Sequence, residues 1–229
     1  MKKNFSEYKI YAFDLDGTIY DQPALRMIMA KRLLGYYILH PFRIGELLII
    51  KDFRKLKDSW EDDGVSASNA TAQIDGIDAR ICEYIANRKK KSPEKVISII
   101  YKWIYDNPLS ALYDTRDVRL IEKIDNMRKK GMKVVVFSDY PPAKKLLALG
   151  IEVDGIYSAQ DDRIGELKPS PKGLIVIAND YNVSPEDIIM IGDRMEKDGV
   201  SAQTAGCDYI ILPRKIKERD SFYESMRID

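Results

Sequence analysis

The sequence predicts an α/β protein with a doubly wound parallel sheet and an inserted all-helical domain. From Thr115 onward, short apolar and β-branched runs alternate with helical patterns of about ten residues, which is typical of a parallel sheet covered by helices. Between Asp21 and Arg116 the pattern is helical and has little strand character. We therefore expect an α/β core made of residues 1–20 and 115–229, and a helical insertion made of residues 21–114.

The composition excludes several classes of protein. The chain has 229 residues, of which 45% are hydrophobic and 32% charged, so it can form a core and is not disordered. Its 37 basic and 36 acidic side chains nearly cancel, and this balance gives no reason to expect a nucleic-acid partner. Cys82 and Cys207 form no zinc or disulfide motif. Because the first residues resemble no signal peptide, we expect a cytoplasmic protein.

The first predicted strand leads into two carboxylates. Tyr8–Phe13 is a near-continuous apolar and aromatic run, as in a short buried strand. Asp14 and Asp16 follow it, and Gly17 indicates a turn. Open parallel sheets bind their ligands at the carboxyl ends of the strands. Taken alone, these acids fit a ligand site and a polar turn equally well.

The insertion is expected to consist of helices connected by loops. The apolar residues recur every three or four positions, and Leu, Met, Ala, Lys and Arg are good helix formers. The helices are expected at Ala24–Leu39, Ile44–Trp60, Ala72–Arg88 and Val96–Tyr105. Gly64–Thr71 reads as a loop. Ser92, followed by Pro93, is the expected start of the last of these helices, and Asn107-Pro108 is its expected end.

Within the insertion, Leu33–Ile50 is strongly apolar. It contains His40, Arg43 and Glu46 and falls short of the ~20 apolar residues that a membrane span needs. Two packed helices are the simplest interpretation, and a surface for a partner or a membrane is the alternative. His40 is the only histidine, and we expect it at a helix end or in the core. A single histidine removes most histidine-based chemistry, such as a three-histidine metal site.

The remaining elements alternate along the core. Strands are expected at Met132–Phe137, Gly155–Ser158, Ile188–Ile191 and Tyr209–Leu212. Helices are expected at Val118–Lys130, Pro141–Leu149, Pro171–Tyr181 (with Ser170 as its N-cap) and Lys197–Ala205. Ser184–Asp187 reads as a turn or a single helical turn. The charged tail after Pro213 shows no pattern.

Polar side chains follow the buried strands at their carboxyl ends. Ser138 and Asp139 follow one strand, Asp193 follows another with Asp198 five residues later, and Lys168 precedes a helix. We expect these side chains to meet Asp14 and Asp16 at one edge of the sheet. Clustered carboxylates repel one another unless a cation lies among them, and oxygen ligands suit Mg²⁺. A Mg²⁺ site with a lysine and a hydroxyl donor can hold a phosphoryl group.

Four of these blocks, in this order, resemble the motifs of the haloacid dehalogenase (HAD) superfamily of phosphotransferases. The blocks are DLDGT (14–18), Ser138, Lys168-Pro169 and GDRMEKD (192–198). The resemblance spans the core and implies a Rossmann-like fold. It further implies that residues 21–114 form a helical cap of the C1 type, because they lie between the first two motifs. The gap from Asp139 to Lys168 is too short for a second cap. A cap of this kind implies a small phosphate ester as substrate.

The resemblance also implies roles for the catalytic and metal-binding residues. Asp14 would be the nucleophile that forms an aspartyl-phosphate, and Asp16 the general acid and then the general base. Mg²⁺ would be held by the Asp14 carboxylate, the Asp16 backbone carbonyl and Asp193. Lys168 would neutralise the charge on the nucleophile and the phosphoryl group.

Further roles implied by the resemblance concern phosphate binding and support. The Ser138 side chain and the Asp139 backbone N–H would bind a phosphate oxygen. Asp198 would orient Lys168 or bind a metal-bound water. Thr18 mildly favours phosphatase-like members, and Asp16 separates this chain from the dehalogenases, which lack that acid.

The expected function is that of a Mg²⁺-dependent phosphomonoesterase, a hydrolase of a small phosphorylated metabolite. A phosphomutase of the same superfamily is the first alternative, and a non-catalytic, cap-mediated binding protein is the second. The expected partner is a small-molecule phosphate ester; neither nucleic acid nor a membrane span is expected. The sequence leaves the oligomeric state open.

Overall fold

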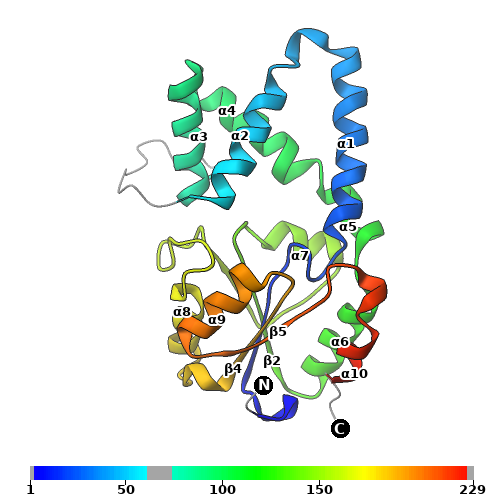
Figure 1. The fold of residues 1–229 in the computed structure, drawn as a ribbon, viewed down its shortest axis with the longest axis vertical. Coiled ribbons are helices and arrows are strands. Elements are labelled where there is room, and N and C mark those ends of the chain that lie inside the picture. Colours follow the sequence, from blue (N-terminus) through cyan, green and yellow to red (C-terminus); the bar gives the residue numbers. More distant parts are fainter. Residues whose placement is uncertain (1–2, 61–73, 226–229) are drawn as a thin grey trace. The chain divides into compact units, whose positions relative to one another are not determined.

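The computed structural model describes residues 3–60 and 74–225 (Figure 1). The chain forms two compact units, residues 1–23 with 112–229 (unit 1) and residues 24–111 (unit 2). The division expected from the sequence lies three residues away at each junction. The loop predicted at Gly64–Thr71 lies outside the described residues.

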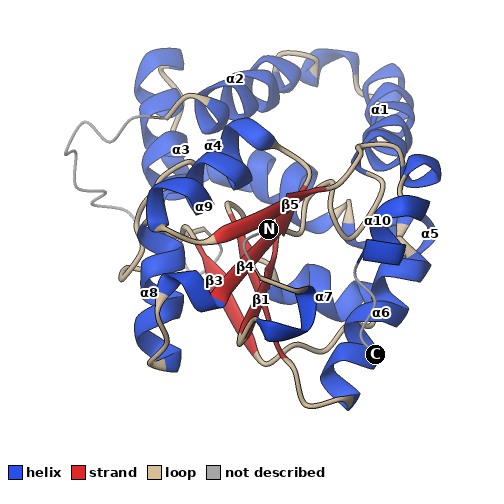
Figure 2. Cartoon of the chain, turned by 60° about the horizontal axis from the view of Figure 1, so that its bottom comes forward, coloured by secondary structure: helices blue, strands red, loops and turns tan. Residues whose placement is uncertain are grey.

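Unit 1 is built on a five-stranded, fully parallel sheet in the order β3-β2-β1-β4-β5. The strands are β1 (Ile10–Phe13), β2 (Lys133–Ser138), β3 (Gly155–Ser158), β4 (Ile188–Gly192) and β5 (Asp208–Ile211). Helices flank both faces (Figure 2): α6 (Val118–Lys129) and α7 (Ala143–Leu149) lie on one side, and α8 (Lys172–Tyr181) and α9 (Val200–Ala205) on the other. The predicted fold class, an α/β protein with a doubly wound parallel sheet, is confirmed.

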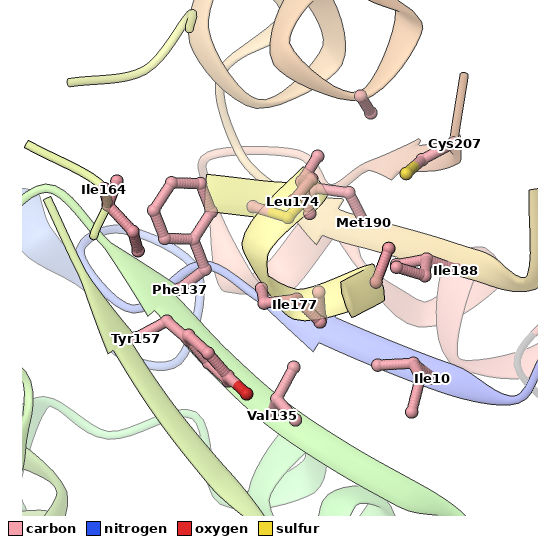
Figure 3. Packing of buried hydrophobic residues seen from close by; sticks show 13 residues of the cluster. Ile10, Val135, Phe137, Tyr157, Ile164, Leu174, Ile177, Ile188, Met190 and Cys207 are labelled. Atoms are coloured by element: carbon pink, nitrogen blue, oxygen red, sulfur yellow. The ribbon is translucent and has the colours of Figure 1, made fainter. Parts of the chain in front are cut away.

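The sheet forms around central strands that are buried on both faces, whereas the edge strands β3 and β5 are partly exposed. The side chains of β1 and of Val134–Phe137 in β2 are almost completely buried, as expected for β-branched and aromatic residues in a central parallel strand. On one face, Ile10, Val135 and Phe137 pack against Leu174 and Ile177 of α8 (Figure 3). This packing fixes the strand ends, from which the polar side chains emerge.

Unit 2 consists of helices in its described residues. They are α1 (Gln22–Leu39, which begins in unit 1), the 3₁₀ turn η2 (Pro41–Arg43), α2 (Glu46–Asp58), α3 (Gly76–Lys89), α4 (Pro93–Ile100) and the π-helical η3 (Tyr101–Asp106). A buried ion pair between Lys57 of α2 and Asp78 of α3, to which Tyr105 also donates, connects three of these elements. Ser92 caps α4, as predicted, by accepting a hydrogen bond from Lys95 N at 3.4 Å.

Several element boundaries differ from the sequence prediction. The helix predicted at Val96–Tyr105 is α4 followed by a π-helical turn, and a π-helical turn (η5, Met195–Gly199) also precedes α9. The prediction missed α5 (Leu109–Thr115), because Pro108 was interpreted as a stop although proline fits the first turn of a new helix. In the tail after Pro213, the described residues form η6 (Ile216–Glu218) and α10 (Asp220–Ser225).

The apolar segment Leu33–Ile50 forms the end of α1, η2 and the start of α2. His40 lies at the end of α1, exposed, with Nδ1 2.9 Å from the Tyr36 carbonyl oxygen. Among the described residues, no single helix has the length and hydropathy of a membrane span. The α1 helix and the segment Pro41–Asp58 reach these values only together, as a pair bent by 118°.

Candidate active site

The candidate site lies in unit 1, at the carboxyl edge of the sheet. Asp14 follows β1, and its backbone N–H still donates to the Ile191 carbonyl in β4 at 2.8 Å. Ser138 ends β2, and Asp193 follows β4. Lys168 lies before α8, and Asp198 lies in η5. The structure thus brings five of the predicted site residues to one edge of the sheet.

Lys168 connects two of the carboxylates. Its Nζ donates to Asp14 Oδ1 and to Asp198 Oδ1, at 2.6 Å in both cases. Burial alone would lower the pKa of Lys168, but the negative charges of Asp14 and Asp198 outweigh this effect and raise it. Lys168 is therefore a fully buried, permanent cation between the two acids.

Asp14 is held at both carboxylate oxygens. Lys168 donates to Oδ1, and Thr18 Oγ1 donates to Oδ2 at 3.1 Å. Burial raises the pKa of Asp14 well above its ordinary value; Lys168 opposes this rise, while Asp198 and Asp16 add to it. The Asp14 carboxylate is thus fixed in orientation and is unstable as an anion without further positive charge.

Asp193 completes a group of three acids that can hold a metal ion. One ligand oxygen from each of Asp14, Asp193 and Asp198 lies within 4.8 Å of the others. Within the described part of the chain, Asp193 Oδ1 is buried and accepts no hydrogen bond. Burial and repulsion from Asp198 raise the pKa of Asp193 to about 6. An unpartnered buried carboxylate oxygen beside two other acids is what a bound cation would satisfy.

The charges around this group support a divalent cation. Asp16 is paired with Lys145, and Asp139 is paired with Lys197 at 3.2 Å, so these two acids are neutralised. The three acids Asp14, Asp193 and Asp198 and the lysine that pairs with two of them, Lys168, together carry a formal charge of −2. One Mg²⁺ would balance it.

Two glycines leave the space that the carboxylates of Asp193 and Asp198 occupy. Gly17 has φ +99°, a left-handed conformation, and a Cβ at this position would lie 2.7 Å from Asp193 Oδ2. A Cβ at Gly192 would lie 2.3 Å from Asp198 Cγ. The DLDGT and GDRMEKD blocks therefore need glycine at these positions, because a side chain would displace the acids.

The Asp16 carboxylate does not belong to this group of three acids and has hydrogen-bond partners of its own. It accepts hydrogen bonds from Ser138 Oγ at 3.1 Å, from Tyr20 and from Lys145 Nζ. Burial raises the pKa of Asp16, but the ion pair with Lys145 and the hydrogen bonds from Lys145, Tyr20 and Ser138 outweigh it, and the pKa is lowered. Asp16 is therefore ionised in this arrangement. The predicted metal contact of Asp16, through its backbone carbonyl, stays a prediction.

Ser138 and Asp139 support their neighbours. Ser138 Oγ donates to Asp16 and accepts from Tyr140 N at 3.1 Å. Asp139 Oδ1 accepts from the backbone N–H of Lys168 at 2.9 Å, so the side chain of Asp139 helps to position this lysine. The sequence assigned a role only to the Asp139 backbone N–H. The phosphate contacts predicted for Ser138 and Asp139 stay predictions.

Sequence reasoning missed three residues that support the site. Lys145 and Tyr20 hold Asp16, and Lys145 follows the Ser138 strand by one short loop, a position that could have indicated it. Arg219, fully buried, donates to the carbonyls of Gly17 (2.7 Å) and Thr18 (2.6 Å) and pairs with Asp117 at 2.9 Å. Nothing in the charged tail distinguishes Arg219 from its neighbours.

Comparison with known proteins adds independent information. A family model for haloacid dehalogenase-like hydrolases matches residues 8–206. The sequence is 25% identical over 209 residues to a glyceraldehyde 3-phosphate phosphatase from Pyrococcus furiosus, covering 86% of this chain and 78% of that protein. It is 29% identical over 128 residues to a glyceraldehyde 3-phosphate phosphatase from Methanopyrus kandleri, and this match covers 54% of each protein, so the chain spans about half the length of that relative.

A solved structure shows the same fold. The HAD-hydrolase YfnB from Bacillus subtilis, in a crystal structure bound to magnesium, matches with a TM-score of 0.64 at 16% identity. The match covers 97% of this chain and 100% of that chain. At this identity the likeness shows the fold of the chain.

Proposed function

This chain belongs to the haloacid dehalogenase-like hydrolases, and on this premise we propose that it is a magnesium-dependent phosphomonoesterase. Its substrate would be a small phosphorylated metabolite, hydrolysed through an aspartyl-phosphate on Asp14. The observation that carries the proposal is the bridge from Asp14 through Lys168 to Asp198, at 2.6 Å on each side, beside the unpartnered oxygen of Asp193. This arrangement combines a fixed carboxylate nucleophile with a buried cation.

In the first step, an oxygen of Asp14 attacks the phosphorus of the ester. The bond between phosphorus and the ester oxygen breaks, and the leaving oxygen takes a proton from Asp16. Thr18 and Lys168 keep Asp14 in one orientation, which reduces the entropy lost at the transition state. The Asp16 carboxylate must therefore leave Lys145 and take up a proton when the substrate binds.

In the second step, Asp16, which is ionised after donating its proton, acts as a base. Its carboxylate takes a proton from a water molecule, the oxygen of this water attacks the phosphorus, and the bond between Asp14 and phosphorus breaks. Inorganic phosphate and the Asp14 carboxylate are the products. The ion pair with Lys145 favours the ionised form of Asp16 that this step needs.

The residues present fit a Mg²⁺ ion. Asp14 and Asp193 would hold it, with the Asp16 backbone carbonyl, and Asp198 would bind one of its waters or orient Lys168. When bound, the ion supplies positive charge that reduces the repulsion between Asp14 and the phosphate.

The family supports a proposal for the substrate class and for the role of unit 2. We propose that residues 24–111 act as a cap that selects the substrate, because they are inserted between the first and second motifs. The two relatives named glyceraldehyde 3-phosphate phosphatases favour a short phosphorylated aldehyde or alcohol among the first compounds to assay.

The proposed reaction is tested by incubating the protein with a panel of small phosphate esters, with Mg²⁺ and with EDTA. We expect Mg²⁺-dependent release of one inorganic phosphate for each ester consumed. Isomerised phosphate ester without released phosphate would instead identify a mutase, and release unaffected by EDTA would refute the assigned metal dependence.

Magnesium binding is expected to stabilise the fold through Asp193. Because the pKa of Asp193 is raised from 3.8 to about 6, the metal-free protein loses stability as the pH rises through this window and the acid ionises. At neutral pH, Asp193→Asn should therefore raise the melting temperature of the metal-free protein. Saturating Mg²⁺, at a hundredfold excess over Kd, should stabilise the wild type by about 2.7 kcal/mol, and the variant much less.

The measurement is thermal unfolding with and without Mg²⁺, from pH 5 to pH 8. Protons compete with the metal at Asp193, so the Mg²⁺-induced shift should shrink below about pH 6. Asp125→Asn, at a half-exposed helix position, is the control and should respond to Mg²⁺ as the wild type does. An undiminished Mg²⁺ shift in Asp193→Asn would exclude Asp193 as a ligand.

Lys145 is expected to set the pH range of activity. Since Lys145 is the main factor that holds the pKa of Asp16 down against burial, Lys145→Met should raise this pKa. The limb of the kcat/KM profile that reports Asp16 should move to higher pH. Lys144→Met, the exposed neighbour, is the control. An unchanged profile in Lys145→Met, or a shift to lower pH, would contradict the assignment of Asp16 as the titrating group.

A further inference from the structure

Unit 2 carries an exposed apolar surface that the proposed phosphatase reaction does not use. It consists of six side chains around the turn between α1 and α2, each more than half exposed: Leu34, Ile38, Leu39, Phe42, Ile44 and Leu48. We call this surface the apolar tip. In Figure 1 the turn that carries it joins the blue helix α1 to α2. Six large apolar side chains exposed around one turn are uncommon on a protein surface that only faces water.

The apolar tip is arranged on both sides of a groove. Leu34 and Ile38 lie four residues apart on one face of α1, and Leu48 of α2 lies four residues after Ile44, the residue that ends η2. A groove of about 380 Å³ runs between the two helices and is lined by apolar side chains such as Leu33 and Leu47. Phe42, in η2, is 102% exposed at the turn itself.

The turn is held by the polar contacts of the buried Glu46, so the outward position of the apolar side chains is built into the fold. Glu46, itself buried, accepts from Tyr37 OH at 3.1 Å and from Arg43 Nε at 2.8 Å. Tyr36 and Tyr37 pack against Trp103, with ring centroids 5.2 and 6.0 Å apart. These contacts fix α1 and α2 at their angle of 118°.

The charges around the apolar tip are mostly basic. Between Gln22 and Asp58, all of which the structure describes, six exposed charged side chains are basic (Arg26, Lys31, Arg43, Lys51, Arg54 and Lys55), and one, Asp58 at the far end of α2, is acidic. Of the other two acids, Glu46 is buried, and Asp52, whose side chain is 37% exposed, pairs with Lys89 at 2.7 Å. The segment has eight basic and three acidic residues, whereas the whole chain is balanced at +1.

We propose that the apolar tip and the basic side chains around it bind the surface of an anionic lipid bilayer. The apolar side chains would enter the boundary between headgroups and acyl chains, while lysine and arginine side chains reach the lipid phosphates. Apolar side chains surrounded by basic ones are complementary to such a surface. A second copy of the chain, docked tip to tip, would bring basic groups together and is disfavoured by like-charge repulsion.

The proposal is tested by flotation of the full chain with vesicles. One set contains phosphatidylcholine alone, and the other contains phosphatidylcholine with phosphatidylglycerol. We expect the protein to float with the anionic vesicles and much less with the neutral ones, and the bound fraction to fall as salt is added. This assay needs no turnover, so its result is independent of the proposed enzymatic function.

Substitutions in the apolar tip test whether this surface is the one that binds the vesicles. Phe42→Glu and Leu39→Glu should each weaken binding to anionic vesicles by about tenfold or more, because each removes apolar contact and adds repulsion. The matched control is Leu147→Glu, on α7 of unit 1, which is 83% exposed against 78% for Leu39 and should bind as the wild type does. Lys31→Glu with Lys51→Glu should remove the preference for anionic lipid. Circular dichroism checks that each variant is folded.

Several results would overturn the proposal. These are no flotation with anionic vesicles, equal flotation with neutral and anionic vesicles, or equal loss of binding in Phe42→Glu and Leu147→Glu. A lipid-free dimer that Phe42→Glu dissociates, in a protein that does not float, would assign the apolar tip to a second copy of the chain.

Discussion

Replacing Asp14 by asparagine is expected to reduce the turnover of every phosphate ester by about 10⁴-fold or more, because the amide oxygen is too weak a nucleophile to form the covalent intermediate. The fold should persist. The amide oxygen can still accept from Lys168, the amide NH₂ can donate to Thr18 Oγ1, and Lys168 keeps its ion pair with Asp198. Burial disfavours the Asp14 anion, so the melting temperature of Asp14→Asn should equal or exceed that of the wild type.

The experiment measures phosphate release and thermal unfolding for Asp14→Asn, Asp14→Glu and Asp125→Asn. Asp14→Glu keeps the charge but moves the reactive oxygen by the length of one methylene group. It should also be inactive, because phosphoryl transfer depends on the position of the attacking oxygen relative to the phosphorus. Asp125→Asn should be fully active. Turnover near the wild-type rate in Asp14→Asn would refute the covalent mechanism.

The second large effect is expected for Asp16→Asn. Its turnover should fall by about 10²- to 10⁴-fold, the usual contribution of a general acid or base. An ester with a good leaving group needs little protonation, so it should still phosphorylate Asp14. Hydrolysis of the phosphoenzyme requires the base, so the phosphoryl group should remain on the protein. The expected signature is one labelled phosphoryl group per chain and slow release of phosphate.

Asp16→Asn also leaves the buried Lys145 without its ionic partner, which could destabilise the site for reasons unrelated to catalysis. The double variant Asp16→Asn/Lys145→Met removes both charges and separates the two effects. It should unfold near the wild-type temperature and still accumulate the phosphoenzyme. Rapid phosphate release from either variant would contradict the role assigned to Asp16.

Most of the sheet could be predicted from the sequence, because its strands are short, buried and β-branched. Runs such as Met132–Phe137 and Ile188–Ile191 differ from the observed strands by one residue at one or both ends. The residues after such strands lie at one edge in any parallel sheet, which explains why Asp14, Ser138 and Asp193 could be grouped from the sequence.

The supporting contacts could not be predicted, because they depend on where side chains from distant segments meet. Arg219 reaches the Gly17 carbonyl across 202 positions of the chain. Lys145 has the same type of side chain as Lys144, and only the packing of α7 makes one of them a buried partner of Asp16 and leaves the other exposed. The outward position of Phe42 and Leu39 is likewise determined by the contacts that Glu46 makes on the inner side of the turn.

The most direct test of the account is to identify the residue that carries the phosphoryl group during turnover. The wild-type protein is mixed with substrate and Mg²⁺, quenched in acid within one turnover, and treated with borohydride, which reduces an aspartyl-phosphate to homoserine. Mass spectrometry of the peptide that contains YAFDLDGTIY then locates the change. We predict homoserine at position 14 and at no other position. Homoserine elsewhere, or an unmodified peptide from an enzyme that is turning over, would contradict the central role of Asp14.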